Sequence, residues 1–114
     1  MGKKSRFVRP ETVKLDLSDG DWIEVKSRLT YGEQQSFAMG HLRYDSKTER
    51  VEADLTESNI KRFATWIVDW SFVDEDGKLV AVSKSAIANL DPDAADEIDK
   101  ALSAYIKQLE SEKN

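Results

Sequence analysis

His41 is the only histidine in this chain of 114 residues, and there is no cysteine. A Ser–His–Asp triad needs a histidine that a carboxylate orients, and a zinc site needs several histidine or cysteine ligands. A thiolate nucleophile and a metal site with two histidines are therefore excluded, and no orienting partner for His41 is in sight, so we expect no triad. His41 lies near the C-terminal end of a predicted helix, where a partly exposed imidazole is electrostatically favourable. We assign it a structural role.

Acidic residues beside Gly20 and Gly77 could supply oxygen ligands to calcium. In an EF-hand loop, the first ligand is acidic and precedes the invariant glycine at a fixed distance. If Gly77 takes the glycine position, Phe72 falls on the first ligand, and the same alignment on Gly20 puts Leu15 there. Both clusters are better explained as turns, in which short polar side chains bond their own backbone. We predict no metal site.

Carboxylates are also paired at the start of the last predicted helix. These residues are Asp91, Asp93, Asp96 and Glu97. They complement the positive end of the helix dipole, although a glycosidase-like pair stays open on the sequence alone. The five glycines are scattered, so no phosphate-binding loop is present. The prediction is a protein that is not an enzyme, with no catalytic residue, no metal and no cofactor.

Composition restricts the fold and the partners. Hydrophobic residues make up 39% of the chain and aromatic residues 9%, which predicts an ordered domain with a single core. The formal net charge is -5, and an acidic chain disfavours nucleic-acid binding. There is no run of about 18 apolar residues and no signal-peptide core, so we expect a cytoplasmic protein that does not bind membranes.

The N-terminal residues 1–11 are locally basic. They include Lys3, Lys4, Arg6 and Arg9. We interpret this segment as a flexible N-terminus, and the alternative is a charged arm that touches an acidic partner. Residues 12–110 are predicted to form a single domain of the α+β class, and residues 111–114 are expected to fray.

Polar and apolar residues alternate in residues 12–17 and 22–26, and a turn cluster joins them. This pattern predicts an N-terminal β-hairpin. Thr30 and Glu33 then form a capping-box pattern at the start of a helix. That helix is expected to turn its apolar residues inward. They are Tyr31, Phe37, Ala38 and Leu42.

Residues 44–54 are charged and predict a variable surface loop, with a short edge strand around residues 50–53. A second helix is predicted from Thr56 to about Trp70, because apolar residues recur at helical spacing. Its core side carries Ile60, Phe63, Ala64, Ile67 and Ser71. On this count, Trp66 and Trp70 lie one turn apart on the flank of the core side.

An Asp-Gly turn at residues 74–77 predicts a second short hairpin, with strands at 71–73 and 79–82. Ser83 is expected to cap a short helix that ends near Leu90. Asp91 and Pro92 then begin the last of three main helices, which reaches about Glu110. Its apolar stripe consists of Ile98, Ala101, Leu102, Tyr105, Ile106 and Leu109. Whether the two hairpins share one sheet stays open.

The candidate contact residues are Trp66, Trp70, Tyr105 and Leu109. The two tryptophans could cover the edge of the core, or they could form an interaction surface, because tryptophan is enriched in interface hot spots. The C-terminal stripe has the same two interpretations. It can dock on its own sheet, or its last turn can pair with another chain.

Several segments carry a family resemblance. In order, they are VKLDLSDGDWIEVK, LTYGEQQSF, IVDWSFVDEDGKLVAVS and AIANLDP, followed by the last helix. The chain resembles the tail assembly chaperones of long-tailed bacteriophages, in particular siphophages of Gram-positive hosts. The resemblance covers about Val13 to Ile106, and its most specific string is D-W-x-x-x-D-x-D-G-K followed by V-x-V-S. Residues 44–51 depart from the pattern and are typical of an insertion.

This resemblance implies a small non-enzymatic protein made during virion morphogenesis. Such chaperones bind the tape-measure protein and help to recruit tail-tube subunits, and they are absent from the mature virion. The expected location is the cytoplasm of the infected bacterial host, and self-association stays open. The alternative is a virion structural protein, such as a head–tail connector or a tail completion protein.

Overall fold

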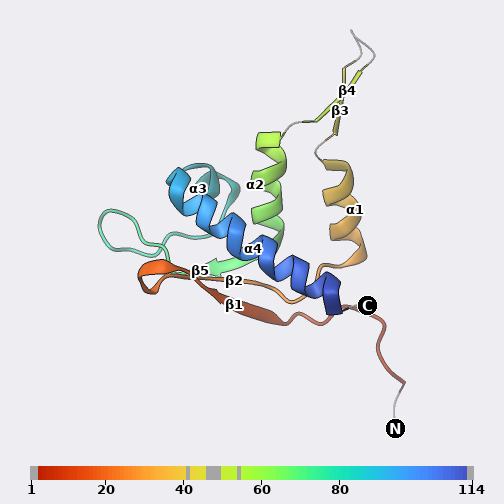
Figure 1. The fold of residues 1–114 in the computed structure, drawn as a ribbon, viewed down its shortest axis with the longest axis horizontal. Coiled ribbons are helices and arrows are strands. Elements are labelled where there is room, and N and C mark those ends of the chain that lie inside the picture. Colours follow the sequence, from red (N-terminus) through yellow and green to blue (C-terminus); the bar gives the residue numbers. More distant parts are fainter. Residues whose placement is uncertain (1–2, 41, 46–49, 54, 113–114) are drawn as a thin grey trace.

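Three antiparallel strands form the central sheet of the protein (Figure 1). The computed structural model describes residues 3–40, 42–45, 50–53 and 55–112, without the side chains of residues 37–58. Strand β1 (Thr12–Asp16) pairs with β2 (Trp22–Lys26), and β2 pairs with β5 (Ile67–Trp70). The predicted N-terminal hairpin is confirmed, and its first strand ends one residue before the predicted end.

The register of the hairpin explains which residues form the core. Val13 lies opposite Val25, and Leu15 lies opposite Ile23, so the apolar residues of both strands share one face of the sheet. A 3-10 turn, η1 (Ser18–Gly20), joins the strands. Gly20 takes a φ of 78°, which a residue without a Cβ adopts at no steric cost.

Strand β5 differs from the predicted structure. Helix α2 (Leu55–Trp66) ends at Trp66, and the chain continues as a strand where the sequence predicted four more helical residues. A β-bulge shifts the register between Glu24 and Val25. Because of this bulge, Ile67 and Trp70 are both buried although they are three residues apart, and the spacing resembles that of a helix.

Helix α1 (Tyr31–Gly40) begins with the predicted capping box. The backbone N–H of Glu33 donates to Thr30 Oγ1 at 3.1 Å, and the N–H of Thr30 donates to Glu33 Oε1 at 3.0 Å. The prediction that Tyr31 points inward is wrong, because it is 77% exposed at the first turn. Leu42 belongs to strand β3 instead of this helix. The side chains of Phe37 and Ala38 and all of His41 lie outside the described residues.

Strands β3 (Leu42–Asp45) and β4 (Arg50–Ala53) form a separate two-stranded sheet that projects beyond α1 and α2 (Figure 1). The predicted edge strand at residues 50–53 is confirmed. Tyr44 and Asp45, which the sequence placed in a loop, pair with Val51 and Arg50. The projecting hairpin helps to explain a radius of gyration of 16.5 Å, because a compact domain of this length measures about 13 Å.

The second predicted hairpin is reduced to one isolated bridge, between Val73 and Leu79. Its Asp-Gly turn is as expected: Gly77 has a φ of 78°, and Asp74 Oδ1 accepts from the backbone N–H of Asp76 at 2.8 Å. The chain then forms α3 (Lys84–Ala88) and α4 (Pro92–Glu112). Both predicted caps are present, because Ser83 Oγ accepts from Ala86 N–H and Asp91 Oδ1 accepts from Asp93 N–H.

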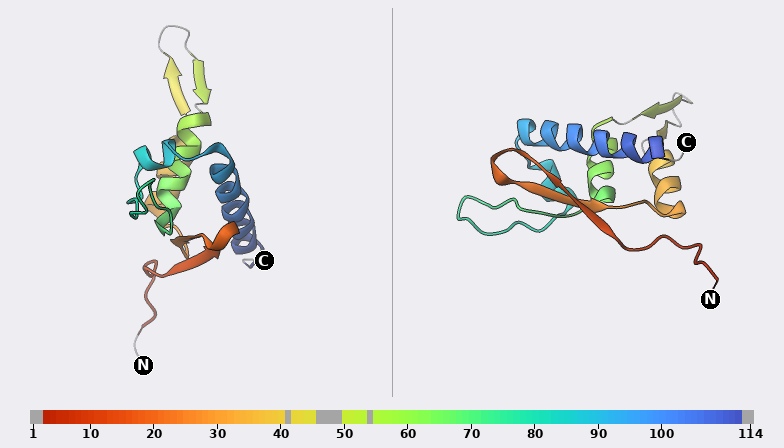
Figure 2. Two further views of the ribbon diagram at one scale, coloured as in Figure 1. Left: turned by 90° about the vertical axis from the view of Figure 1, so that its left-hand side faces the viewer. Right: turned by 60° about the horizontal axis from the view of Figure 1, so that its bottom comes forward.

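Helices α2 and α4 lie over the same face of the sheet, and α4 extends along the length of the sheet (Figure 2). The core lies between these layers. It contains Ile23, Val25, Leu29, Phe63, Trp66, Ile67, Trp70, Ile87, Ile98 and Leu102. At its edge, Arg62 of α2 forms an ion pair with Asp99 of α4, and Glu97 accepts from Ser18 N–H at 2.7 Å. The protein is thus a small α+β domain.

Candidate protein-interaction site

Trp66 is the last residue of α2 and lies where α2, α4 and the end of β2 meet. Its indole is only 7% exposed. It packs edge to face against Tyr105 of α4, with ring centroids 6.3 Å apart and planes at 90°. The sequence placed Trp66 on the margin of the core, and this placement is wrong. The indole is a core group with one edge at a pocket.

Tyr105 fixes the C-terminal half of α4 to the sheet. Its phenol O–H donates to the backbone carbonyl of Ser27, with an oxygen–oxygen distance of 3.1 Å, just after β2 ends. Burial raises the pKa of the Tyr105 phenol, and the nearby negative charge of Glu112 raises it further. Tyr105 is therefore a neutral hydrogen-bond donor that holds two elements together.

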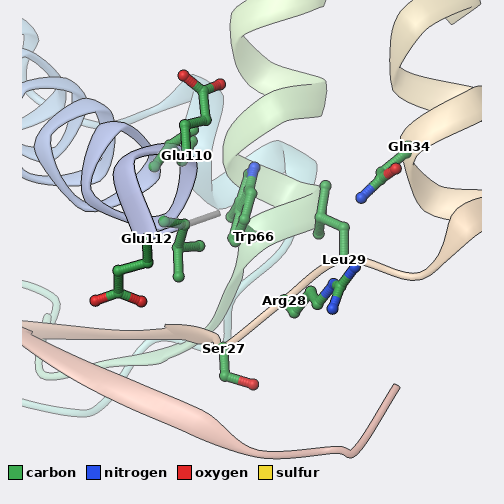
Figure 3. A pocket seen from close by; sticks show the side chains of 9 residues that line it. Ser27, Arg28, Leu29, Gln34, Trp66, Glu110 and Glu112 are labelled. Carbon is green, nitrogen blue, oxygen red and sulfur yellow. The ribbon is translucent and has the colours of Figure 1, made fainter. Parts of the chain in front are cut away.

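A pocket of about 450 Å³ opens beside this contact. Its apolar wall consists of Leu29, Trp66, Ile106 and Leu109. Figure 3 shows Trp66 between α4, which carries Glu110 and Glu112, and the opposite wall with Leu29 and Gln34. Arg28 lies on the same side as Leu29. The site is therefore apolar at its floor and charged at its rim, which is typical of a protein-interaction surface.

The wall opposite α4 depends on the capping box of α1. Glu33 also forms an ion pair with Lys26, at the end of β2. Burial raises the pKa of the Glu33 carboxyl. The hydrogen bond and positive charge of Lys26 and the hydrogen bonds from Thr30 lower it by more, so the pKa lies below its ordinary value of 4.5. The segment that carries Leu29 is thus held at both of its ends.

Of the four candidate contact residues, Trp66 and Leu109 line this pocket, and Tyr105 packs against Trp66 beside it. Trp70 does not, because it lies in β5 and is 2% exposed. Its Nε1–H donates to the carbonyl of Val80 at 2.6 Å, and its ring packs against Phe72 with centroids 5.0 Å apart. The predicted flank position of Trp70 is therefore wrong, since this side chain anchors residues 71–82 to the sheet.

Arg28, Leu29 and Gln34 also line the pocket, although no motif in the sequence singled them out. Leu29 immediately precedes the helix N-cap Thr30, which is the position of an apolar residue in a hydrophobic staple. That position is a signal for burial, and Leu29 is 7% exposed. Nothing in the local sequence indicates that Leu29 faces the end of α4.

Three of the four acidic residues at the start of α4 have structural partners. Asp91 caps α4, Glu97 binds the turn at Ser18, and Asp96 lies 3.3 Å from Lys100. Within the described part of the chain, no three His, Cys, Asp or Glu side chains are grouped as metal ligands. Among the helices that the structure describes, none is long and apolar enough to span a membrane.

Comparisons of the chain with protein-family models, with curated proteins and with solved structures find no match.

Proposed function

We propose that this protein is a tail assembly chaperone of a long-tailed bacteriophage. In this role it binds the tape-measure protein reversibly, helps tail-tube subunits to assemble, and catalyses no reaction. The proposal is carried by the ordered resemblance of the segments between about Val13 and Ile106. On this proposal the domain has three main helices and one short helix, and residues 71–82 carry the single bridge between Val73 and Leu79.

The pocket beside Trp66 supports a binding role. Its volume of about 450 Å³ lies within the range of about 300–1,000 Å³ that bound ligands occupy, so it can accept one or two apolar side chains of a partner. Leu109 and Ile106 are partly buried and provide the apolar contact. The charged rim keeps this surface compatible with a free, soluble state, which a reversible chaperone needs.

Co-expression with the tape-measure protein of the same phage tests the proposal. We expect the tape-measure protein to co-purify with the tagged chain and to become more soluble. If it does neither, the proposal is wrong. Mass spectrometry of purified virions separates the chaperone from a structural protein, because a connector or completion protein stays in the particle and the chaperone does not.

A further inference from the structure

The basic N-terminal segment and the apolar pocket share a wall. Four residues line both the pocket beside Trp66 and a second, open hollow of about 1020 Å³, whose other wall is formed by residues 3–9. The shared residues are Ser27, Arg28, Leu29 and Gln34. The two hollows therefore adjoin, and residues 27–29 with Gln34 separate them at the surface. A segment that crosses these residues can contact both hollows.

The second hollow concentrates positive charge on an acidic protein. Its cations are Lys3, Lys4, Arg6, Arg9 and Arg28, all of which are exposed. Among the described residues, one of these cations, Arg9, forms an exposed ion pair with Glu11, with Nη1 and Oε1 3.8 Å apart. Five of the 17 basic residues thus lie together, although the net charge of the chain is -5. Such a cluster attracts an anionic group.

Two exposed aromatic side chains lie among these cations. Phe7 is 88% exposed and Tyr31 is 77% exposed, and both line the basic hollow. Exposed aromatic rings of this kind gain contact area when a partner covers them. On the opposite side of the apolar pocket, the rim carries Glu110 and Glu112. The charge of the whole surface is therefore polarised, from acidic at α4 to basic at residues 3–9.

We propose that these two adjoining hollows together bind an acidic, extended segment of a partner protein. An apolar side chain of that segment occupies the pocket beside Trp66, and the carboxylates next to it contact Lys3, Lys4 and Arg6. This inference rests on the proposed function, since it describes the segment of the tape-measure protein that the chaperone recognises. The polarised rim also fixes the direction of the segment, because carboxylates placed beside Glu110 would be repelled.

A protein segment fits this surface better than a nucleic acid. Nucleic-acid sites carry a basic groove along their whole length, with aromatic rings on which bases stack. Here the pocket between the two charged sides is lined by aliphatic side chains and the buried Trp66, and carboxylates close one side of it. A phosphate backbone that follows the cations would therefore meet Glu110 and Glu112.

The test uses the full chain and fluorescence anisotropy with labelled synthetic peptides. The first peptide has two leucines followed by a run of glutamates. The second has the same leucines followed by lysines, and the third replaces the leucines with serines. A single-stranded oligonucleotide is the fourth probe. We expect the first peptide to bind about tenfold more tightly than the second and third, and to bind more weakly at about 300 mM than at about 50 mM salt.

Variants locate the binding. Lys3→Ser, Lys4→Ser and Arg6→Ser together should weaken binding of the first peptide about tenfold without affecting folding, because these residues lie outside every helix and strand. Lys78→Ser, Lys84→Ser and Lys100→Ser make the same change in net charge at exposed positions away from the pocket, and should leave binding unchanged.

Equal binding of the first two peptides, no effect of the N-terminal variant, or tighter binding of the oligonucleotide would each overturn the inference. Co-expression with the tape-measure protein separates this failure from a failure of the proposed function. If that protein is retained equally by the wild type and the N-terminal variant, the chaperone function stands and the inference falls. If the acidic peptide needs Lys3, Lys4 and Arg6 but the tape-measure protein is not retained, the surface chemistry stands and the chaperone function falls.

Discussion

The rings of Trp66 and Tyr105 meet edge to face, with centroids 6.3 Å apart and planes at 90°. This geometry places the electropositive edge of one ring against the face of the other, and such pairs contribute about 0.5–1.5 kcal/mol beyond their buried area. The contact joins the end of α2 to the C-terminal half of α4. It therefore holds together the two elements that border the pocket lined by Leu29 and Leu109.

Replacing Tyr105 by phenylalanine should loosen this junction without removing the ring contact. The Tyr105→Phe variant loses the hydrogen bond to the Ser27 carbonyl, and we expect the free energy of unfolding to fall by about 1 kcal/mol. Urea unfolding followed by tryptophan fluorescence measures this change. Tyr31→Phe is the matched control, because Tyr31 is 77% exposed, and it should leave the stability within about 0.5 kcal/mol of wild type. Equal stability of all three proteins would show that the Tyr105 hydroxyl contributes nothing.

Trp70 should behave as a core residue in mutagenesis. Trp70→Ala removes a side chain that is 2% exposed and leaves a cavity, so we expect the free energy of unfolding to fall by about 3–5 kcal/mol. Trp70→Phe keeps an aromatic ring but loses the Nε1–H bond to Val80, so its effect should be smaller. Leu79→Ala is the control at a 75% exposed position and should change stability by less than about 0.5 kcal/mol. Thermal unfolding of the three variants gives the order of their stabilities. A Trp70→Ala protein as stable as wild type would contradict the structure.

The ion pair of Glu33 with Lys26 should make stability depend on pH. The pKa of Glu33 lies below its ordinary value of 4.5, so the folded state favours the carboxylate. This contribution is complete above pH 4.5 and is lost as the pH falls through the lower folded-state pKa. Glu33→Gln keeps the capping reach to Thr30 but loses the charge, so near neutral pH it should be less stable by about 0.5 kcal/mol.

The measurement is the difference in melting temperature between wild type and Glu33→Gln, followed from neutral to acidic pH. The difference should shrink as the solution becomes more acidic, because the wild-type carboxyl is then protonated. Glu110→Gln, at an exposed rim position, controls for the general loss of one negative charge. A difference that stays constant or grows in acid would show that the ion pair does not supply the effect.

Leu109→Asp should weaken partner binding at the pocket. A carboxylate on this wall cannot enter an apolar contact without losing its hydration, so retention of the tape-measure protein in co-expression should fall about tenfold or more. Leu79→Asp introduces the same change at a 75% exposed site in residues 71–82 and should leave retention intact. Circular dichroism of both variants confirms folding. Equal retention by the two variants would place the contact surface elsewhere.

Local signals in the sequence predicted the helix caps and the Asp-Gly turn correctly. The capping box of Thr30 and Glu33, the cap at Ser83 and the turn at Asp74 each depend on atoms within four residues of one another. Their hydrogen bonds need no partner from a distant part of the chain. The alternation in residues 12–17 and 22–26 likewise predicted the hairpin and its buried face.

The tryptophans show where local patterns mislead. Buried or partly buried apolar residues at 60, 63, 66, 67 and 70 follow spacings of three and four, which is the period of a helix. A strand with a β-bulge produces the same spacing, because the bulge turns Ile67 and Trp70 to one face. The bulge lies opposite Glu24 and Val25, more than forty residues earlier in the chain, so no window around Trp70 contains this information.

The sequence by itself determined the α+β class, the hairpin, the caps and an apolar stripe on the last helix, because short-range hydrogen bonds and periodic burial act within single elements. Only the tertiary structure decided that β5 joins the sheet, that Trp66 and Trp70 are core, and that Leu29 and Leu109 line one pocket. These features arise from contacts between segments far apart in the chain. The energies of these contacts depend on how α2 and α4 pack over the sheet, and no single position of the sequence indicates this packing.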